Sequence, residues 1–421
     1  MRKYIVRGGT PLYGSTGVQG AKNSALPILA ASVLSGGRCV IRNCPALSDV
    51  EATLASLRHV GCETLREGGA VVVDSARAEG SEIPEPLMRE MRSSVIFLGA
   101  LLAKTGYARL SAPGGCEIGL RPIDLHLDAM RRLGAAVKDD AGVIECRAPD
   151  GLKGANITLS FPSVGATENI MIAAATAKGE TLVVNAAREP EISDLADYLN
   201  GMGAKISGAG EGTVRIRGVS GLHPAEHTVI PDRIAAATLL AAAAATGGEV
   251  TVNRVIPAHL EPVLAAFAEA GCDTRIRGDA IRLTAPARLK AVSTVRTMPY
   301  PGFPTDFQAP FTAVLTKADG ASVVIETIFE SRFKYIGELV RFGAKIRRDG
   351  RMAVIEGVPR LYPAGVVTPD LRGGAALVLA ALSAEGESEI RDVRHIERGY
   401  EDICGAVRAL HGNMEAVSAA P

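Results

Sequence analysis

The chain contains no tryptophan, and only 4% of its 421 residues are aromatic. Proteins that bind single-stranded nucleic acid stack the bases on aromatic side chains, so this composition argues against that class of function. Lysine plus arginine and aspartate plus glutamate are equal at 46 each, so no net charge attracts nucleic acid or an anionic membrane. Any basic site of the protein must therefore be local.

Long hydrophobic runs are also missing. The longest apolar run, residues 234–245, is too short to span a bilayer, and the start MRKYIVRGG predicts a strand rather than a secretory signal. Hydrophobic residues nevertheless make up 47% of the chain, enough to fill the cores of two or three domains. We therefore expect a soluble globular protein of the cytoplasm, without nucleic-acid or membrane partners.

The seven cysteines include no C-x-x-C pair, and their number is odd. They fit neither a disulfide framework nor a zinc site. His223 and His227 have a spacing that metal ligands can show, but Pro224 lies between them and no cluster of cysteines or carboxylates accompanies them. We expect no metal site.

Two series of glycines repeat along the chain with the same period of about seventy residues. The first series marks the turn from an apolar helix into a strand: Gly37, Gly106, Gly179, Gly248, Gly320 and Gly386. The second marks the C-terminal end of a helix before an alternating strand: Gly61, Gly134, Gly203, Gly271, Gly343 and Gly412. Together they predict six copies of a unit with two helices and roughly four strands.

One helix of each unit is apolar nearly all round, as in residues 23–34, 167–177, 235–245 and 374–384. Such a helix belongs inside a protein. The other helix is amphipathic, as in residues 123–133 and 333–342. We therefore expect buried helices surrounded by sheets and outer helices, with three units in each of two similar domains that face each other.

Residues 112–127 form the most unusual segment of the chain. Cys116 lies between Gly114 and Gly119, and glycines give the backbone a freedom that suits a segment that opens and closes. Pro122 favours the first turn of a helix, and Arg121 before it can hold an anion near the free N–H groups of that turn. The segment is a candidate reactive centre.

Polar residues recur at the predicted starts of the buried helices. Four of them are cations: Lys22, Arg92, Arg233 and Arg372. A cation at a helix N-terminus is unfavourable unless an anion is bound or a carboxylate lies opposite, so these cations indicate an anionic ligand. For Ser163, Thr167 and Asp370 we expect helix capping instead.

Nine motifs in a fixed order resemble the enolpyruvyl transferase family, and within it the enzymes that act on UDP-N-acetylglucosamine. They are GAKNSALPILAA (20–31), MRSS (91–94), PGGCEIGLRPIDLH (113–126), PSVGATENIM (162–171), REPEISDLA (188–196), YPGFPTDFQAPF (300–311), FESRF (329–333), DLRGGAALV (370–378) and HIERGYE (395–401). The resemblance extends from about residue 1 to residue 413. Single motifs are weak evidence, but nine in this order are specific.

The resemblance implies an α/β fold of two inside-out α/β barrel domains with three repeats each. One domain would comprise residues 22–229 with the Cys116 loop, and the other residues 1–21 plus 230–421. It also implies that the enolpyruvyl group of phosphoenolpyruvate is added to the 3-hydroxyl of UDP-N-acetylglucosamine, and that phosphate is then eliminated, as the first committed step of peptidoglycan synthesis. Neither a cofactor nor an obligate protein partner is implied.

The resemblance also assigns the site residues. Cys116 would be the acid, or at least assist addition and product release, and Asp306 would be the base, with Lys22 and Arg398 also in the catalytic centre. Phosphoenolpyruvate would be bound by Lys22, Asn23, Arg121, Arg332, Arg372 and Arg398, with Arg332 and Arg372 on its carboxylate. UDP-N-acetylglucosamine would be bound by Asn23, Arg92, Arg121, Pro122, Ile123, Asp124, Leu125, Ser163, Val164, Gly165, Asp306 and Ile328.

The sequence departs from the family pattern at two positions. Phe161 stands where many relatives have a lysine that contacts the diphosphate. Relatives commonly read D-R-I-E at residues 232–235, and here Ala235 takes the place of the glutamate. Two alternatives are an enolpyruvyl transferase that acts on shikimate 3-phosphate and a non-catalytic protein that binds a nucleotide sugar. The first family lacks the PGGC-x-IG-x-RPID loop. The second is disfavoured by four intact residues, Cys116, Asp306, Lys22 and Arg398.

Overall fold

The computed structural model describes residues 2–90, 92–111, 123–140 and 142–418. These residues form two compact units, which we call the N-terminal unit (Gly20 to Ile230) and the C-terminal unit (the residues up to Gln19 and those from Pro231 onward). Each unit has a hydrophobic core of its own. The chain crosses between the units at Gln19–Gly20 and at Ile230–Pro231.

The N-terminal unit contains three four-stranded sheets among its described residues. In hydrogen-bonded order, the first sheet consists of β14 (Glu226–Thr228), β3 (Arg38–Arg42), β5 (Ala70–Asp74) and β4 (Glu63–Glu67). The second consists of β6 (Glu82–Ile83), β7 (Tyr107–Ser111), β9 (Val143–Arg147) and β8 (Ala136–Asp140). The third consists of β10 (Asn156–Thr158), β11 (Glu180–Val184), β13 (Thr213–Arg217) and β12 (Lys205–Ser207). In each sheet the first two strands are parallel and the other neighbours are antiparallel.

The C-terminal unit repeats this pattern in three more sheets. The first of them consists of β2 (Tyr13–Gly17), β15 (Glu249–Asn253), β17 (Ala280–Thr284) and β16 (Asp273–Arg277). The second consists of β18 (Thr294–Arg296), β19 (Ala321–Ile325), β21 (Met352–Glu356) and β20 (Lys345–Asp349). The third consists of β22 (Gly365–Val367), β23 (Gly386–Arg391), β1 (Arg2–Gly8) and β24 (Asn413–Ser418). The first strands of the chain thus complete sheets whose other strands come from the second half of the sequence. The six predicted repeats of four strands are confirmed.

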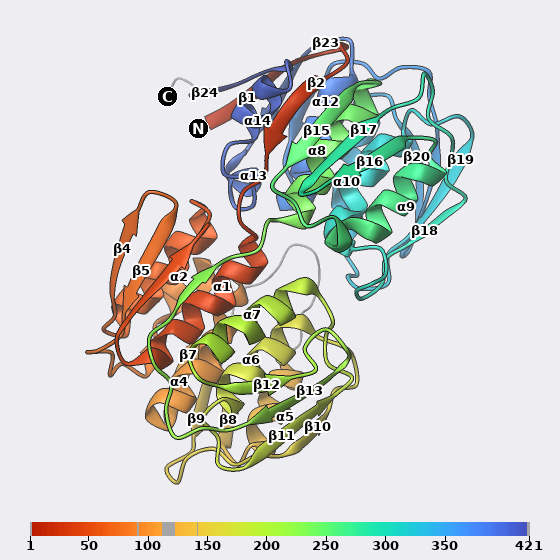
Figure 1. Cartoon of the computed structure of the whole chain (residues 1–421). Coiled ribbons are helices and arrows are strands. Elements are labelled where there is room, and N and C mark those ends of the chain that lie inside the picture. The colour runs from red at the N-terminus through yellow and green to blue at the C-terminus, as the bar shows by residue number, and fades with distance from the viewer. Residues whose placement is uncertain (1, 91, 112–122, 141, 419–421) are drawn as a thin grey trace. The chain divides into compact units, whose positions relative to one another are not determined.

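Each repeat contributes one buried helix, as the apolar segments predicted. These helices are α1 (Lys22–Ala31), α4 (Phe97–Thr105), α6 (Val164–Ala174), α8 (Arg233–Thr246), α10 (Thr305–Leu315) and α12 (Leu371–Ser383). Every residue of α8 from Ile234 to Ala245 is buried, because its alanines allow α10 and α12 to pack closely against it. Figure 1 shows strands at the periphery of each unit and helices inside.

The remaining helices lie beside the buried ones or connect them to the sheets. They are α2 (Ser48–His59), α3 (Glu85–Glu90), α5 (Asp124–Arg132), α7 (Pro190–Gly201), α9 (Glu261–Glu269), α11 (Ile336–Arg341), α13 (Arg394–Glu397) and α14 (Ile403–Ala409), with the 3-10 turns η1 (Ser32–Ser35), η2 (Arg92–Ile96), η3 (Pro257–Leu260) and η4 (Arg332–Tyr335). None of the helices within the described ranges combines the length and apolar character that crossing a bilayer requires.

Five of the six predicted helix-ending glycines adopt the left-handed conformation, with φ between 88° at Gly343 and 98° at Gly203. The prediction for Gly412 was wrong. There the left-handed residue is His411, with φ 58°, and its ring stacks on Tyr13 with centroids 4.2 Å apart. This ring contact stabilises a backbone conformation that a side chain otherwise disfavours.

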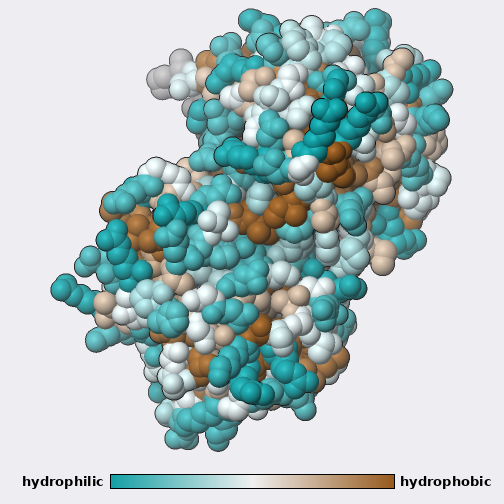
Figure 2. All heavy atoms as spheres, in the orientation of Figure 1, coloured by the Kyte–Doolittle hydropathy of each residue, from teal (hydrophilic) through white to brown (hydrophobic). Residues whose placement is uncertain are grey.

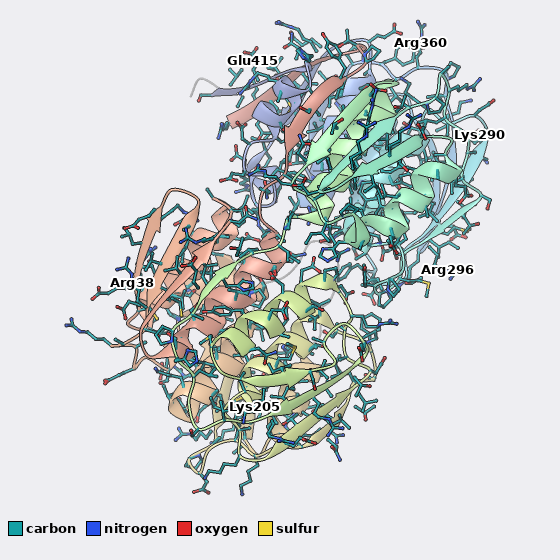
Figure 3. The ribbon with its side chains drawn as sticks, in the orientation of Figure 1. Arg38, Lys205, Lys290, Arg296, Arg360 and Glu415 are labelled. Carbon is teal, nitrogen blue, oxygen red and sulfur yellow. The ribbon has the colours of Figure 1, made fainter. Side chains whose placement is uncertain are left out.

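The face of the molecule drawn in Figure 2 is mainly polar. Figure 2 shows apolar residues in scattered small groups among hydrophilic ones. Arg38 of β3, Lys205 of β12 and Arg296 of β18, which are labelled in Figure 3, are exposed strand residues. The buried charges described below lie at helix starts or, for Glu326, directly after a strand instead.

Candidate functional site

Three of the predicted site residues meet in the C-terminal unit. Asp306 is the second residue of α10, Arg332 begins η4, and Arg372 is the second residue of α12. Arg332 Nη2 donates to Asp306 Oδ1 at 2.7 Å, and Arg372 Nη2 donates to Asp306 Oδ2 at 3.1 Å. Two guanidinium groups therefore converge on the two oxygens of one carboxylate, an arrangement suited to binding carboxylates.

The two arginines are almost completely buried, with 3% of each side chain exposed, whereas 27% of Asp306 is exposed. Burial acts to lower the pKa of Arg372, but the negative charge of Asp306 together with Tyr400 and Asp232 outweighs it, so the pKa lies above its ordinary value. Among the described atoms, the Nε groups of both arginines are buried without a hydrogen-bond partner. The guanidinium group of Arg372 is thus kept in its charged form.

Neighbouring residues fix the orientation of the arginines. Arg332 Nη2 also donates to the carbonyl of Thr305 at 3.2 Å, and Arg372 Nη1 donates to Tyr400 Oη at 3.4 Å. The Tyr400 hydroxyl is in turn 2.9 Å from Thr238 Oγ1 on α8. Asp370 caps α12 by accepting from the backbone N–H groups of Arg372 and Gly373 at 2.9 Å each, as expected for this residue.

In the N-terminal unit, Lys22 lies at the start of α1 and its ammonium is 3.1 Å from Asp49 Oδ2 on α2. Both side chains are buried. Because Asp49 provides a carboxylate for Lys22, and Asp306 provides one for Arg372, two of the four helix-start cations have an internal counter-charge. For these two, the carboxylate accounts for a cation at a helix start, and the anionic ligand that they were taken to indicate stays a prediction.

The segments expected to hold the nucleotide sugar lie at the starts of α5 and α6. Ser163 caps α6, since its hydroxyl accepts from the N–H of Ala166 at 3.4 Å, and Val164 and Gly165 form the first turn. Ile123 precedes α5, whose first residues are Asp124 and Leu125. The expectation that Thr167 also acts as a cap was wrong, because its buried hydroxyl donates to the Ser163 carbonyl from inside the helix.

A buried hydrogen-bond network joins these starts to η2. Asn169 of α6 donates through Nδ2 to His126 Nδ1 on α5 at 2.9 Å and to the Val95 carbonyl at 2.9 Å. Its Oδ1 accepts from the N–H of Gly99 on α4 at 2.7 Å. Burial lowers the pKa of His126 to about 4, so the imidazole is neutral and can accept this hydrogen bond.

The other predicted residues are placed separately or lie outside the described residues. Asn23 is the half-buried second residue of α1, Ile328 is half-buried in the segment after β19, and Arg398 is half-buried directly after α13. The backbone of Arg92 begins η2. The predictions for Cys116, Arg121 and Pro122, and for the side chain of Arg92, lie outside the described part of the structure.

Sequence reasoning missed Asp49, Tyr400 and Glu326, which hold predicted residues in place. Asp49 in the first turn of an amphipathic helix looks like a helix-start carboxylate, and Glu326 follows an alternating strand like any surface glutamate. At the two departures from the family pattern, Phe161 is 41% exposed and Ala235 is buried at 3% exposure. Within the described ranges, no group of three or more His, Cys, Asp or Glu could hold a metal ion; His227 instead bonds Asp194 at 2.8 Å.

Comparison with known proteins assigns the chain to a family. The sequence model of EPSP synthase (3-phosphoshikimate 1-carboxyvinyltransferase) matches residues 6–406. The UDP-N-acetylglucosamine 1-carboxyvinyltransferase 2 of Caldanaerobacter subterraneus is 50% identical, over 98% of this chain and 99% of the relative. The chain belongs to the enolpyruvyl transferase family. A second relative, UDP-N-acetylglucosamine 1-carboxyvinyltransferase 1 of Symbiobacterium thermophilum, is 51% identical over 95% of this chain and 92% of its own.

Solved structures agree with the fold of this enolpyruvyl transferase. The enolpyruvyl transferase NikO from Streptomyces tendae superimposes with a TM-score of 0.89 at 25% identity, covering 100% of this chain and 99% of its own. An EPSP synthase from Acinetobacter baumannii has a TM-score of 0.75 at 17% identity, covering 99% of this chain and 100% of its own, which is evidence for the fold alone. The predicted fold class is confirmed.

Proposed function

We propose that the protein transfers the enolpyruvyl group of phosphoenolpyruvate to the 3-hydroxyl of UDP-N-acetylglucosamine and releases phosphate. The observation that carries the proposal is the 50% identity, over nearly the whole of both chains, to a UDP-N-acetylglucosamine 1-carboxyvinyltransferase. The division into compact units at Gly20 and Pro231 supports the expected domains, residues 22–229 and residues 1–21 plus 230–421.

The carboxylate of phosphoenolpyruvate is assigned to Arg332 and Arg372. The support is direct, because these two guanidinium groups already bind the two oxygens of one carboxylate, that of Asp306. A donor carboxylate would replace or share these hydrogen bonds and release Asp306 for the acceptor hydroxyl. The phosphate is assigned to Lys22, Asn23, Arg121 and Arg398.

The reaction then needs an acid, a base and a leaving group. Cys116 gives a proton to C3 of phosphoenolpyruvate while Asp306 takes the proton of the sugar 3-hydroxyl, whose oxygen bonds to C2. In the elimination step the Cys116 thiolate takes a proton back from C3 of the tetrahedral intermediate, which restores the C2–C3 double bond as the C2–O bond to phosphate breaks. The electron pair of that bond leaves on the phosphate, which takes up the proton held by Asp306. Lys22, Arg121 and Arg398 stabilise the departing phosphate.

The nucleotide sugar is assigned to residues of both halves of the sequence. The uridine and diphosphate are assigned to Asn23, Arg92, the segment Arg121, Pro122, Ile123, Asp124 and Leu125, and the segment Ser163, Val164 and Gly165. The His126–Asn169 network supports this assignment, because it joins η2 to the starts of α5 and α6. Ile328 and Asp306 are assigned to the sugar.

Shikimate 3-phosphate is the alternative acceptor, since the family model that matches is that of EPSP synthase. The identities favour the nucleotide sugar: 50% to the relative that acts on it, against 17% to a solved EPSP synthase. A non-catalytic role is disfavoured because Asp306, Arg332 and Arg372 form a complete carboxylate-binding arrangement. The proposed place of the reaction is the cytoplasm, where the six buried free cysteines described would stay reduced.

Phosphate release tests the proposal directly. The purified protein is given phosphoenolpyruvate with either UDP-N-acetylglucosamine or shikimate 3-phosphate, and the product is identified by mass spectrometry. We expect release with the nucleotide sugar alone, and loss of turnover in Asp306→Asn. Release with shikimate 3-phosphate, or with neither acceptor, would overturn the proposal.

A further inference from the structure

In each sheet one inner strand pairs in parallel with an edge strand, and the residue directly after that inner strand has a common role in several repeats. Asn43 follows β3 and donates to the Val229 carbonyl at 2.9 Å, and Asn185 follows β11 and donates to the Leu159 carbonyl at 2.8 Å. Each acceptor follows the parallel edge strand of the same sheet. The two asparagines adopt positive φ, 53° and 58°, as do the corresponding residues after β15 and β23, Arg254 and Asp392. This position normally forms a left-handed turn tied to the edge strand.

The repeat that carries Asp306 departs from this pattern. Glu326 follows β19, and it is not among the described residues with positive φ. Thr327 also contacts the residue after the edge strand: its N–H donates to Thr297 Oγ1 at 2.9 Å, and its hydroxyl donates to the Thr297 carbonyl. Glu326 keeps a contact with Thr297 as well, but its carboxylate has two oxygens and bonds further partners.

That carboxylate is 1% exposed and accepts four hydrogen bonds. Its Oε1 accepts from Thr297 Oγ1 at 2.9 Å, from the N–H of Ile328 at 2.8 Å and from the N–H of Phe329 at 3.0 Å. Its Oε2 accepts from Thr305 Oγ1 at 2.9 Å. All four donors are neutral, and burying a carboxylate against neutral donors costs more than burying an amide. A buried carboxylate here, where two other repeats have asparagine and two have the more exposed Arg254 and Asp392, needs a reason beyond folding.

The reason is found in what the four bonds connect. Thr305 is the residue before Asp306, and its carbonyl accepts from Arg332 Nη2 at 3.2 Å. Ile328 lies in the segment that leads from β19 to Arg332. Glu326 thus joins the segment that carries Ile328 to the start of the helix that carries Asp306.

We infer that Glu326 is a positioning residue, which sets Ile328 and Asp306 for the acceptor sugar through the backbone N–H groups of Ile328 and Phe329 and the Thr305 hydroxyl. The inference rests on the proposed function of Asp306 and Ile328. Glu326 touches no reacting atom, so its contribution is to the geometry of groups that do.

Two variants of the full chain test it. In Glu326→Gln, the amide oxygen can accept the three bonds of Oε1, and the amide NH₂ can donate to the Thr305 hydroxyl, which accepts as readily as it donates. In Glu326→Ala all four bonds are lost. We expect Glu326→Ala to lower kcat/KM for UDP-N-acetylglucosamine at least tenfold, and Glu326→Gln to restore it to within a few-fold of the wild type.

The control is Ile355→Ala, which removes a fully buried side chain from β21 of the same sheet. It should lower the melting temperature without changing KM for the nucleotide sugar, so it measures what destabilisation alone does. If Ile355→Ala and Glu326→Ala change KM equally at equal loss of melting temperature, Glu326 is merely structural and the inference fails.

Hydrogen exchange separates this inference from the proposed function. Without substrates, the amides of Ile328 and Phe329 should exchange faster in Glu326→Ala than in the wild type or Ile355→Ala, and Glu326→Gln should restore protection. Unchanged exchange would overturn the inference even if the enzyme is active. Faster exchange in a protein that releases no phosphate from either acceptor would support the positioning of Ile328 and refute the proposed function alone.

Discussion

Lys22 Nζ lies 3.1 Å from Asp49 Oδ2, with 11% and 3% of the two side chains exposed. Lys22 begins α1, where the positive end of the helix dipole disfavours a cation. Asp49 lies in the first turn of α2, where the dipole favours a carboxylate. The contact therefore pairs a cation that is unfavourable at one helix start with a carboxylate that is favourable at another.

Asp49→Asn should destabilise the protein strongly. The change keeps the shape but removes the counter-charge of a buried ammonium, which typically costs about 3 kcal/mol or more in the free energy of unfolding. The measurement is urea denaturation at neutral pH. Glu51→Gln is the matched control, because Glu51 lies on the same helix and pairs with Arg66 at 3.0 Å on the surface, where the loss should stay below about 1 kcal/mol. Equal losses in the two variants would contradict this account.

Cys116 should be the only cysteine that reacts rapidly with an epoxide such as fosfomycin. The six cysteines within the described residues are all buried, and burial raises the pKa of Cys62, Cys146 and Cys404 to about 11 and that of Cys272 to about 12. Buried thiols with raised pKa values are poor nucleophiles at neutral pH. Mass spectrometry after limiting treatment should find one adduct, at Cys116.

Labelling mainly at Cys39, Cys62 or Cys404 would refute that prediction. Cys116→Asp provides the functional control, because a carboxyl group can still donate a proton but does not offer a thiolate to the epoxide. This variant should keep measurable phosphate release and become insensitive to the epoxide.

The fold could be predicted from the sequence because its signals are local and repeated. A helix-ending glycine such as Gly61 or Gly343 can be predicted from the residues around it, without knowledge of a distant partner. The burial of an apolar helix such as residues 235–245 can be predicted from its composition alone. The prediction for Gly412 failed because the left-handed residue there is His411. The ring of His411 stacks on that of Tyr13, which is distant in the sequence. No local pattern carries that information.

The site could be predicted only in part, for the same reason. Resemblance supplied Lys22, Asp306, Arg332 and Arg372, but not the contacts among them. Arg372 and Asp306 are 66 residues apart, and Lys22 and its partner are 27 apart on different helices. The packing of the helices decides which carboxylate pairs with which cation. The sequence alone therefore did not predict that Asp49 pairs with Lys22 or that Asp306 pairs with Arg372.

The neutral His126 should make stability fall in acid. Burial lowers its pKa to about 4, whereas an unfolded chain has a histidine pKa of about 6.5. Between these values the unfolded state binds more protons than the folded one, so stability decreases as the pH falls from about 6.5 toward 4, by up to about 3 kcal/mol. Urea denaturation across this range should show that the wild type loses more stability than His126→Gln.

His223→Gln is the control for that comparison, because His223 is exposed. Its stability should follow the wild type at every pH. If His126→Gln also follows the wild type in parallel through this range, the imidazole is not held neutral and the role of the Asn169 hydrogen bond must be revised.

Arg372→Lys should weaken the binding of phosphoenolpyruvate more than that of the nucleotide sugar. A lysine keeps the charge but cannot bond Asp306 and Tyr400 in one plane, as Arg372 does at 3.1 and 3.4 Å. Losing one charged hydrogen bond costs about 1 to 3 kcal/mol, so KM for phosphoenolpyruvate should rise about tenfold or more. Steady-state kinetics with each substrate varied in turn measures the two effects.

Two further variants decide what an effect of Arg372→Lys means. Tyr400→Phe removes only the hydroxyl that Arg372 Nη1 bonds, so it should change KM for phosphoenolpyruvate less than Arg372→Lys does. Arg360→Lys, on the surface, should change neither KM. If Arg372→Lys raises both KM values equally, the guanidinium acts chiefly by holding Asp306 and the donor assignment is wrong. A selective rise for phosphoenolpyruvate would mean that Asp306 gives up this arginine when the donor carboxylate arrives.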